Sequence, residues 1–116
     1  MNEYGILTTK KEIEKHEAGK YNSFSQEGIY HLRLDCRYWY TNRSVYGLVC
    51  CFTDIDACDK HWQGFCFKHT VNGEEIYCPK DGSVNMREAE DGTVWDITIR
   101  KTPRGKYTME SAKQIA

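Results

Sequence analysis

The sequence contains no long hydrophobic run. Its longest apolar-rich stretch, VYGLVCCF at residues 45–52, is far too short to cross a lipid bilayer. The first twenty residues are polar and charged, and they lack the apolar segment that a secretory signal carries. We therefore expect a soluble cytoplasmic protein with no membrane partner.

Motifs that would identify an enzyme are also missing. The chain has no glycine-rich phosphate loop, no Gly-x-Ser-x-Gly and no nucleotide-binding fingerprint. It has neither His-Glu-x-x-His nor the His-x-Glu and Pro-Cys-x-x-Cys pattern of nucleobase deaminases. These absences favour a binding protein with no catalytic residues. A small enzyme that uses a Cys/His pair or a metal is the third hypothesis.

The net charge of the 116 residues is only −1, which argues against a strongly basic nucleic-acid module. The charge is nevertheless uneven, because residues 54–96 hold ten acidic and four basic side chains. Such an acidic segment can steer a chain onto a basic partner. Glu74, Glu75 and Asp91 are the candidate partner-binding acids. The alternative is ordinary solvated charge on exposed strands.

The chain length predicts a single domain over residues 1–116. A capping pattern at Thr9 and a stop at Gly19 predict a short helix over about 9–19. Residues 29–110 carry β-type patterns, and residues 111–116 read as a frayed tail. Tyr30, Leu32, Leu34, Cys36, Tyr38 and Tyr40 alternate with polar neighbours, which predicts one apolar face of a long strand.

Two turn signals predict β-hairpins. Asn72-Gly73 joins FCFKHTV to EEIYCPK, so that Phe67 should oppose Cys78. Asp91-Gly92 joins SVNMREAE to TVWDITIRK, so that Arg87 should oppose Asp96. The fold class expected from these elements is α+β: a short N-terminal helix packed on a strongly bent antiparallel sheet, or a small open barrel, of six to seven strands.

The stretch CDKHWQGFCFKH, residues 58–69, suggests a zinc site. Zinc binds four thiolate or imidazole ligands at tetrahedral corners. Cys58, His61 and Cys66 are close enough in sequence to converge, and Cys51 is the first choice for the fourth ligand. The other candidates for that position are Cys50, Cys78, His69 and Cys36. A structural zinc would contribute directly to the folding free energy of so small a chain.

Other interpretations of the cysteines remain open. Cys36, Cys50 and Cys78 can equally be small buried hydrophobic residues, and His69 a buried histidine bonded to backbone. Six cysteines would also permit three disulfides if the protein were secreted.

The stretch HLRLDCRYWYTNR interleaves basic and aromatic residues. Arg33, Arg37 and Trp39 fall on the polar side of the predicted strand, where they could stack bases or hold phosphates. They could also form a protein-binding patch, since Arg and Trp are common hot-spot residues. The alternative is a solvated strand in which Trp39 covers a neighbour.

The profile resembles that of small inhibitors carried by phages and mobile elements, including anti-CRISPR proteins that block RNA-guided DNA nucleases. The resemblance rests on size, missing enzyme motifs, the CDKHWQGFC cluster and the acidic 54–96 segment. It implies a zinc-stabilised, non-enzymatic inhibitor of a protein target such as a CRISPR effector nuclease, acting in the host cytosol. The second hypothesis is a zinc-containing nucleic-acid-binding module that uses Arg33, Arg37 and Trp39.

Overall fold

A computed structural model describes residues 5–7, 10–15, 18–42 and 45–116 of the chain. The fold is mostly β, with 57% of residues in strands and 10% in helices, so the expectation of an α+β class is wrong. The α-helix α1 is described over Lys10–Lys15, and a 3₁₀ turn, η2, over Ala18–Lys20. Of the helix expected over 9–19, residues 9, 16 and 17 lie outside the described part.

The described part of α1 offers little surface for packing. Ile13 is its only large apolar residue, and it packs against a small core on one side of the sheet. A helix this short is not stable on propensity alone and depends on such a contact. None of the helices in the described part of the chain has the length and apolar character needed to span a membrane.

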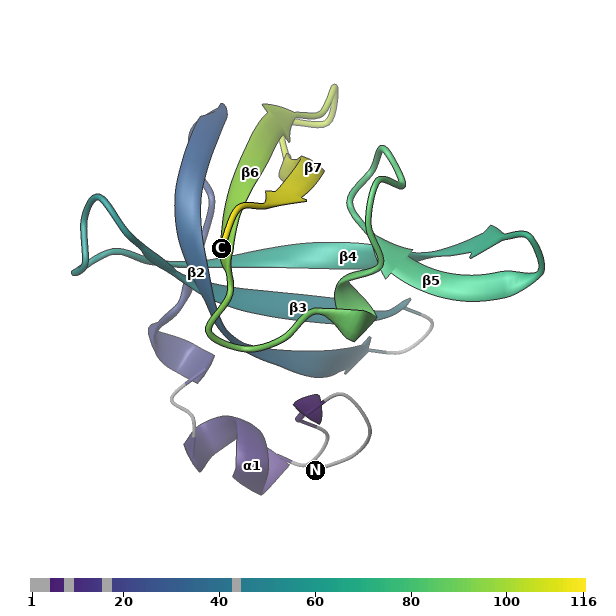
Figure 1. The fold of residues 1–116 in the computed structure, drawn as a ribbon, viewed down its shortest axis with the longest axis horizontal. Coiled ribbons are helices and arrows are strands. Elements are labelled where there is room, and N and C mark those ends of the chain that lie inside the picture. The colour runs from purple at the N-terminus through teal and green to yellow at the C-terminus, as the bar shows by residue number, and fades with distance from the viewer. Residues whose placement is uncertain (1–4, 8–9, 16–17, 43–44) are drawn as a thin grey trace.

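Seven strands of the described chain form one sheet, in the order β1-β4-β3-β2-β6-β7 with β5 also paired to β4 (Figure 1). Neighbouring strands are antiparallel except β1 and β4. The strands are β1 Asn22–Ser23, β2 Gly28–Asn42, β3 Val45–Asp54, β4 His61–Val71, β5 Glu74–Cys78, β6 Val94–Lys101 and β7 Tyr107–Gln114.

The sheet curls so that β7 approaches β4. Figure 1 shows β6 and β7 rising steeply from the level of β3 and β4. Met109 on β7 lies over Gly64 on β4. The segment that follows β5 lies against β7, because the backbone N–H groups of Lys80 and Asp81 donate to the carbonyls of Met109 and Glu110.

The hairpin predicted at Asn72-Gly73 is confirmed. Phe67 pairs with Cys78, His69 with Ile76 and Val71 with Glu74, as the two-residue loop requires. Asn72 and Gly73 have φ values of 51° and 81°. Positive φ at both central positions is what a type I′ turn needs, and Asn-Gly supplies it at low cost.

The hairpin predicted at Asp91-Gly92 is wrong. β6 pairs with β2 and β7, and the preceding segment is an irregular connection with a 3₁₀ turn, η3, at Met86–Glu88. Met86 is fully buried, so this segment packs a side chain into the core and does not form a strand. Asp96 consequently meets His31 on β2, with Nδ1 and Oδ1 2.5 Å apart, and not Arg87.

A register shift in β2 divides the core. Between Leu34 and Cys36 the pairing with β3 contains a bulge, which leaves Asp35 as the extra residue. Leu32 and Leu34 therefore face one core, while Cys36 faces the other. The expected continuous apolar face of this strand is wrong beyond position 34. The first core is built on Leu32, Leu34, Leu48, Cys50, Phe52, Cys66, Met86, Trp95, Ile97, Ile99 and Met109. The second core contains Leu7, Tyr21, Cys36, Val49 and Cys51.

The expected frayed tail is largely strand. β7 continues to Gln114, and Ala112 is buried opposite Ile97 on β6. Beyond the strand, the backbone N–H of Ile115 donates to the carbonyl of Val94. Ala112 faces the core in this pairing, which explains why a weakly apolar sequence stays in the sheet.

Candidate functional site

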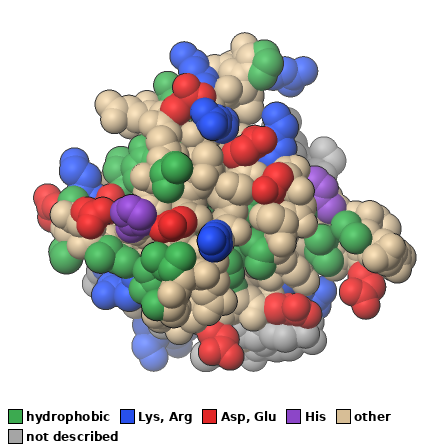
Figure 2. All heavy atoms as spheres, turned by 45° about the horizontal axis from the view of Figure 1, so that its top comes forward, with side chains coloured by type: hydrophobic (Ala, Val, Ile, Leu, Met, Phe, Trp, Pro, Cys, Tyr) green, Lys and Arg blue, Asp and Glu red, His purple; other side chains and the backbone are tan. Residues whose placement is uncertain are grey.

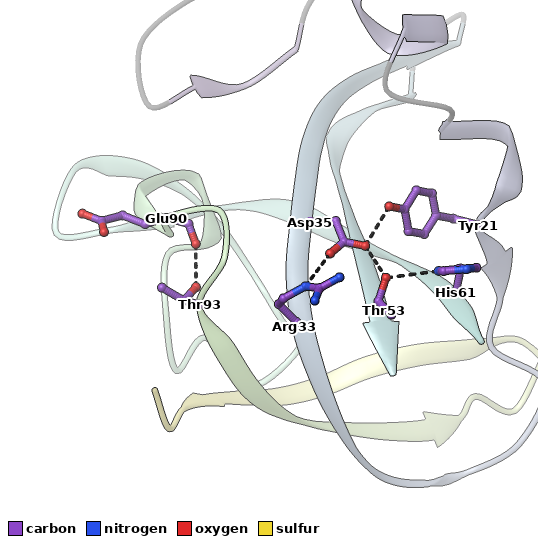
Figure 3. Close-up of polar contacts among 7 residues, drawn as sticks. All are labelled: Tyr21, Arg33, Asp35, Thr53, His61, Glu90 and Thr93. Atoms are coloured by element: carbon purple, nitrogen blue, oxygen red, sulfur yellow. Dashed lines mark hydrogen bonds and ion pairs between the residues drawn. The ribbon is translucent and has the colours of Figure 1, made fainter. Parts of the chain in front are cut away.

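The bulge in β2 places Asp35 in the wall of a cleft of about 510 Å³. The cleft lies where β2, β3 and β4 meet the segment that leads into β1. Its polar wall contains Tyr21, Arg33, Thr53 and His61 in addition to Asp35 (Figure 3). β-Bulges often re-aim a side chain next to a functional site, and here the bulge turns a carboxylate toward three polar partners.

Asp35 accepts hydrogen bonds from three of these side chains. The Tyr21 hydroxyl donates to Oδ2 at 2.8 Å, and Arg33 Nε donates to Oδ1 at 3.0 Å. Thr53 Oγ1 also donates to Oδ2. Two donors on one oxygen and a cation on the other satisfy an ionised carboxylate well. Asp35 therefore orients its neighbours and does not offer a free negative charge to the cleft.

Thr53 connects Asp35 to His61. Its only hydroxyl hydrogen goes to Asp35, so its oxygen is an acceptor toward His61 Nδ1, 3.1 Å away. This assigns the imidazole hydrogen to Nδ1 and leaves Nε2 available to a ligand. No partner for Nε2 is present among the described residues. The relay fixes both the tautomer and the orientation of the ring.

Tyr21 closes the cluster from the N-terminal side. Burial, together with the Asp35 carboxylate, raises the pKa of the Tyr21 hydroxyl well above its usual value. The hydroxyl therefore stays protonated and remains a hydrogen-bond donor. The Tyr21 ring also meets the His61 ring edge-on, with centroids 5.7 Å apart. These contacts make the segment before β1 part of the cleft wall.

The cationic side of the cleft is supplied by Arg33 and Lys20. Arg33 is half exposed, and Nε is bound to Asp35. Its two terminal amino groups have no hydrogen-bond partner in the described part of the chain. Lys20 Nζ lies 5.5 Å from the centre of the Tyr21 ring. Asp54 also lines the cleft, but its Oδ1 accepts from the backbone N–H groups of Asp56 and Ala57.

The four predicted zinc ligands do not converge in this structure. Cys66 faces the first core and Cys51 the second. His61 lines the cleft, and Cys58 is exposed, with its thiol directed at the Ile55 carbonyl. The physical reason is strand geometry, because positions 61 and 66 of β4 are an odd number apart and point to opposite faces.

The alternative ligands are separated in the same way. Cys36 and Cys51 oppose each other on β2 and β3, and the second core encloses them both. Cys50 and Cys66 meet in the first core, with sulfur atoms 4.0 Å apart. Cys78 is buried and His69 lies on the β4–β5 hairpin. Within the described residues, no three His, Cys, Asp or Glu side chains form a group that fits a metal ion. Zinc binding stays a prediction.

The predicted acidic residues do not stand apart from basic ones. Glu74 and Glu75 are exposed on β5, and Glu75 Oε1 lies 3.6 Å from Lys68 Nζ. Asp91 Oδ1 lies 3.5 Å from Arg37 Nε. On the face drawn in Figure 2, acidic and basic side chains alternate among hydrophobic ones. The folded chain thus neutralises part of the acidic segment.

The predicted basic and aromatic face is not one surface. Arg37 is only 1% exposed, and its Nη1 donates to the carbonyls of Met86 at 3.1 Å and Arg87 at 2.7 Å. Trp39 is partly buried against Tyr77, with ring centroids 4.8 Å apart. The bulge at Asp35 turns these two residues inward. Of the three, Arg33 alone keeps an exposed guanidinium.

A second hollow surface follows the edge of β4. Three adjoining hollows, of about 200, 440 and 310 Å³, share lining residues such as Phe65, Phe67 and Tyr107. Among the described strands, β1 pairs only with residues 62 and 63 of β4 and β5 begins to pair at 67. The open edge between them faces β7. We call this surface the β4–β7 groove.

Aromatic rings and lysines line the β4–β7 groove. Phe65 packs edge-on against both Tyr40 and Phe67, at centroid distances of 5.6 and 4.8 Å. Lys101 Nζ lies 5.8 Å from the centre of the Tyr107 ring. The aromatic lining consists of Phe24, Tyr38, Tyr40, Phe65, Phe67 and Tyr107, and the lysines are Lys68, Lys80 and Lys106.

Sequence reasoning missed most of both surfaces. Asp35 stands at a polar position of an alternating strand, and nothing in that pattern signals a bulge. Thr53 stands at the end of an apolar stretch, and Tyr21 precedes the region of β-type patterns. Neither position belongs to a motif that would mark it as a site residue. Comparisons with family models, curated proteins and solved structures found no match to this chain. Function therefore has to be inferred from the geometry of the chain's own residues.

Proposed function

We propose that this protein is a non-enzymatic, cytoplasmic binding protein that holds single-stranded nucleic acid in the β4–β7 groove. One observation carries the proposal: the described residues that line the groove include six aromatic side chains and three lysines but no carboxylate. In a chain with net charge −1, a lining that lacks acidic groups is a local exception. It complements a ligand that is both flat-ringed and anionic.

The aromatic rings suit unpaired bases. Phe67 is 48% exposed, and Tyr40, Phe65 and Tyr107 are partly exposed beside it. Stacking of a base on such a ring contributes about 1–3 kcal/mol and tolerates any sequence. Bases in a duplex are already stacked and cannot reach these rings, so the groove favours single strands.

The lysines suit the backbone that would accompany those bases. Lys80 and Lys106 are exposed at the groove, whereas Lys68 also forms an ion pair with Glu75. Neutralising phosphates with such side chains releases counterions, which makes binding depend on salt. This proposal keeps the nucleic-acid hypothesis but moves its surface from Arg37 and Trp39, which are turned inward, to the groove.

The test is a fluorescence-anisotropy titration with labelled oligo(dT), at low and near-physiological salt. Phe67→Ala should weaken binding by about 1–3 kcal/mol, because one stacking platform is lost. Lys106→Glu should weaken binding and lower the slope of log K against log salt by about 0.7 for the lost phosphate contact.

Lys11→Glu is the matched control, since Lys11 is an exposed lysine on α1, outside the groove. It should bind oligo(dT) like the wild type. If Lys11→Glu and Lys106→Glu weaken binding equally, the loss reflects net charge and not a contact in the groove. If oligo(dT) does not bind even at low salt, the proposal is refuted. A duplex of the same length should bind more weakly than the single strand.

The inhibitor hypothesis remains a separate prediction for the exposed acids of β5. If the protein blocks an RNA-guided nuclease through a basic surface, Glu74→Lys with Glu75→Lys should slow association at low salt and have less effect at high salt. Groove variants should leave that association unchanged. Retained nuclease inhibition in the acid-reversal variant would remove the acids of β5 from that role.

A further inference from the structure

From the cleft around Asp35 we infer a second ligand site, which binds a phosphate monoester between Arg33 and His61. The site is independent of the β4–β7 groove, because the two surfaces share no lining residue. The ligand is a terminal phosphate, carried either by a free nucleotide or by the 5′ end of a nucleic acid.

The arginine is prepared for this role by Asp35. The carboxylate holds Arg33 through Nε, at 3.0 Å, and thereby fixes the plane of the guanidinium. The two terminal amino groups have no partner within the described residues and are the fork that binds two oxygens of one phosphate. An arginine fixed in this way loses less conformational entropy when its ligand binds.

The histidine is prepared by Thr53. The Asp35–Thr53–His61 relay anchors Nδ1, so that Nε2 is the ring nitrogen left for a ligand in the cleft that His61 lines. A phosphate monoester loses its second proton near neutral pH, with a pKa of about 6. A phosphate monoester can therefore share a proton between one of its oxygens and Nε2.

The acidic residues of the cleft do not oppose an anion as strongly as their number suggests. Asp35 is satisfied by three side-chain donors, and Asp54 caps the loop that follows β3. Lys20 adds a second cation to the lining. A volume of about 510 Å³ lies within the range of small-ligand pockets and leaves room for a group attached to the phosphate.

The test is an NMR titration of the His61 ring signals with adenosine 5′-monophosphate, and with adenosine as the matched ligand that lacks phosphate. The monophosphate should shift the signals of His61 and adenosine should not. Arg33→Gln should weaken monophosphate binding at least tenfold. Arg100→Gln, which removes an exposed arginine on β6, should leave it unchanged.

Arg33 is half exposed, so Arg33→Gln should keep the fold, and an unchanged amide spectrum away from the cleft verifies this. His61→Gln is the second variant; its titration is followed by the backbone amide signals of the cleft residues, and it should also weaken binding. Equal responses to monophosphate and adenosine would overturn the inference. So would monophosphate binding that survives Arg33→Gln.

Two oligo(dT) probes separate the sources of the phosphate. If the 5′ end of a strand is the ligand, a 5′-phosphorylated probe should bind more tightly than a 5′-hydroxyl probe, and Arg33→Gln should abolish the difference. If a free nucleotide is the ligand, the two probes should bind equally while the monophosphate still shifts His61. Lys106→Glu should leave monophosphate binding intact, so failure of the groove proposal does not imply failure of this one.

Discussion

Met109 and Gly64 touch across the gap between β7 and β4. A Cβ atom at position 64 would lie 2.2 Å from the Met109 sulfur and 2.9 Å from its Cγ. Met109 is buried in the first core, so it cannot move aside without disturbing its neighbours. The missing side chain at Gly64 is therefore what allows β7 to pack against β4.

Gly64→Ala should lower the free energy of unfolding by about 1–3 kcal/mol, the usual cost of overpacking a core. Urea denaturation monitored by tryptophan fluorescence measures the change. Gly19→Ala is the matched control, because a Cβ at position 19 would meet nothing within 4 Å. If the two variants prove equally stable, the contact with Met109 is not a constraint on the fold.

Arg37→Met should lower the free energy of unfolding by about 3 kcal/mol, because the buried Met86 carbonyl, the partly buried Arg87 carbonyl and Asp91 all lose the guanidinium that they contact. Methionine keeps much of the side-chain volume, so the loss reports the polar contacts and not a cavity. Arg33→Met, at a half-exposed position, should cost far less in the same denaturation experiment. A stable Arg37→Met protein would mean that η3 packs without its anchor.

Cysteine substitutions distinguish the folded core from a zinc site. Burial predicts that Cys66→Ser and Cys36→Ser each cost about 1–3 kcal/mol, while Cys58→Ser leaves the melting temperature unchanged. A structural zinc held by Cys58 and Cys66 predicts instead that Cys58→Ser and Cys66→Ser each lower the melting temperature far more than Cys36→Ser does. Thermal melts with and without a chelator, together with elemental analysis of the purified protein, decide between the two.

His31 should titrate above its ordinary pKa. Its hydrogen bond to Asp96 raises the pKa of the imidazole, since the carboxylate favours the charged ring. The stability contributed by this pair is present below pH 6.5 and is lost as pH rises through the raised pKa of the folded state. An NMR titration should show the His31 midpoint falling in Asp96→Asn. An unchanged midpoint would indicate that the pair is broken in solution.

Local turn chemistry and alternation predicted part of the fold well. Asn72-Gly73 fixes its hairpin because the φ values that it needs are available to those two residues and few others. The strand that starts at Gly28 was recognisable from its period of two. Both signals are local, so they do not depend on what the sheet meets later.

The bulge at Asp35 could not be predicted in this way, because it depends on contacts made by distant segments. The backbone of Leu34 bonds to Gly92 and Thr93 beside the bulge, and the Asp35 side chain bonds to Tyr21 and Thr53. One extra residue reverses the side-chain directions that follow it. Unbroken alternation along β2 placed Arg37 and Trp39 on the solvent side, whereas the bulge turns both of them inward.

The neighbouring cysteines of β3 face opposite sides of the sheet, so the rate at which each reacts with a thiol reagent reports how often the core on its own side opens. Cys50 shares the first core with Cys66, and Cys51 shares the second with Cys36. A thiol reagent can modify either pair only when the core around it opens. Cys58 is exposed and reacts first. If the Cys36–Cys51 pair is then labelled in an earlier phase than the Cys50–Cys66 pair, as resolved by mass spectrometry, the layer under the N-terminal segment opens without the main core. A single phase would mean that both sides of the sheet melt as one unit.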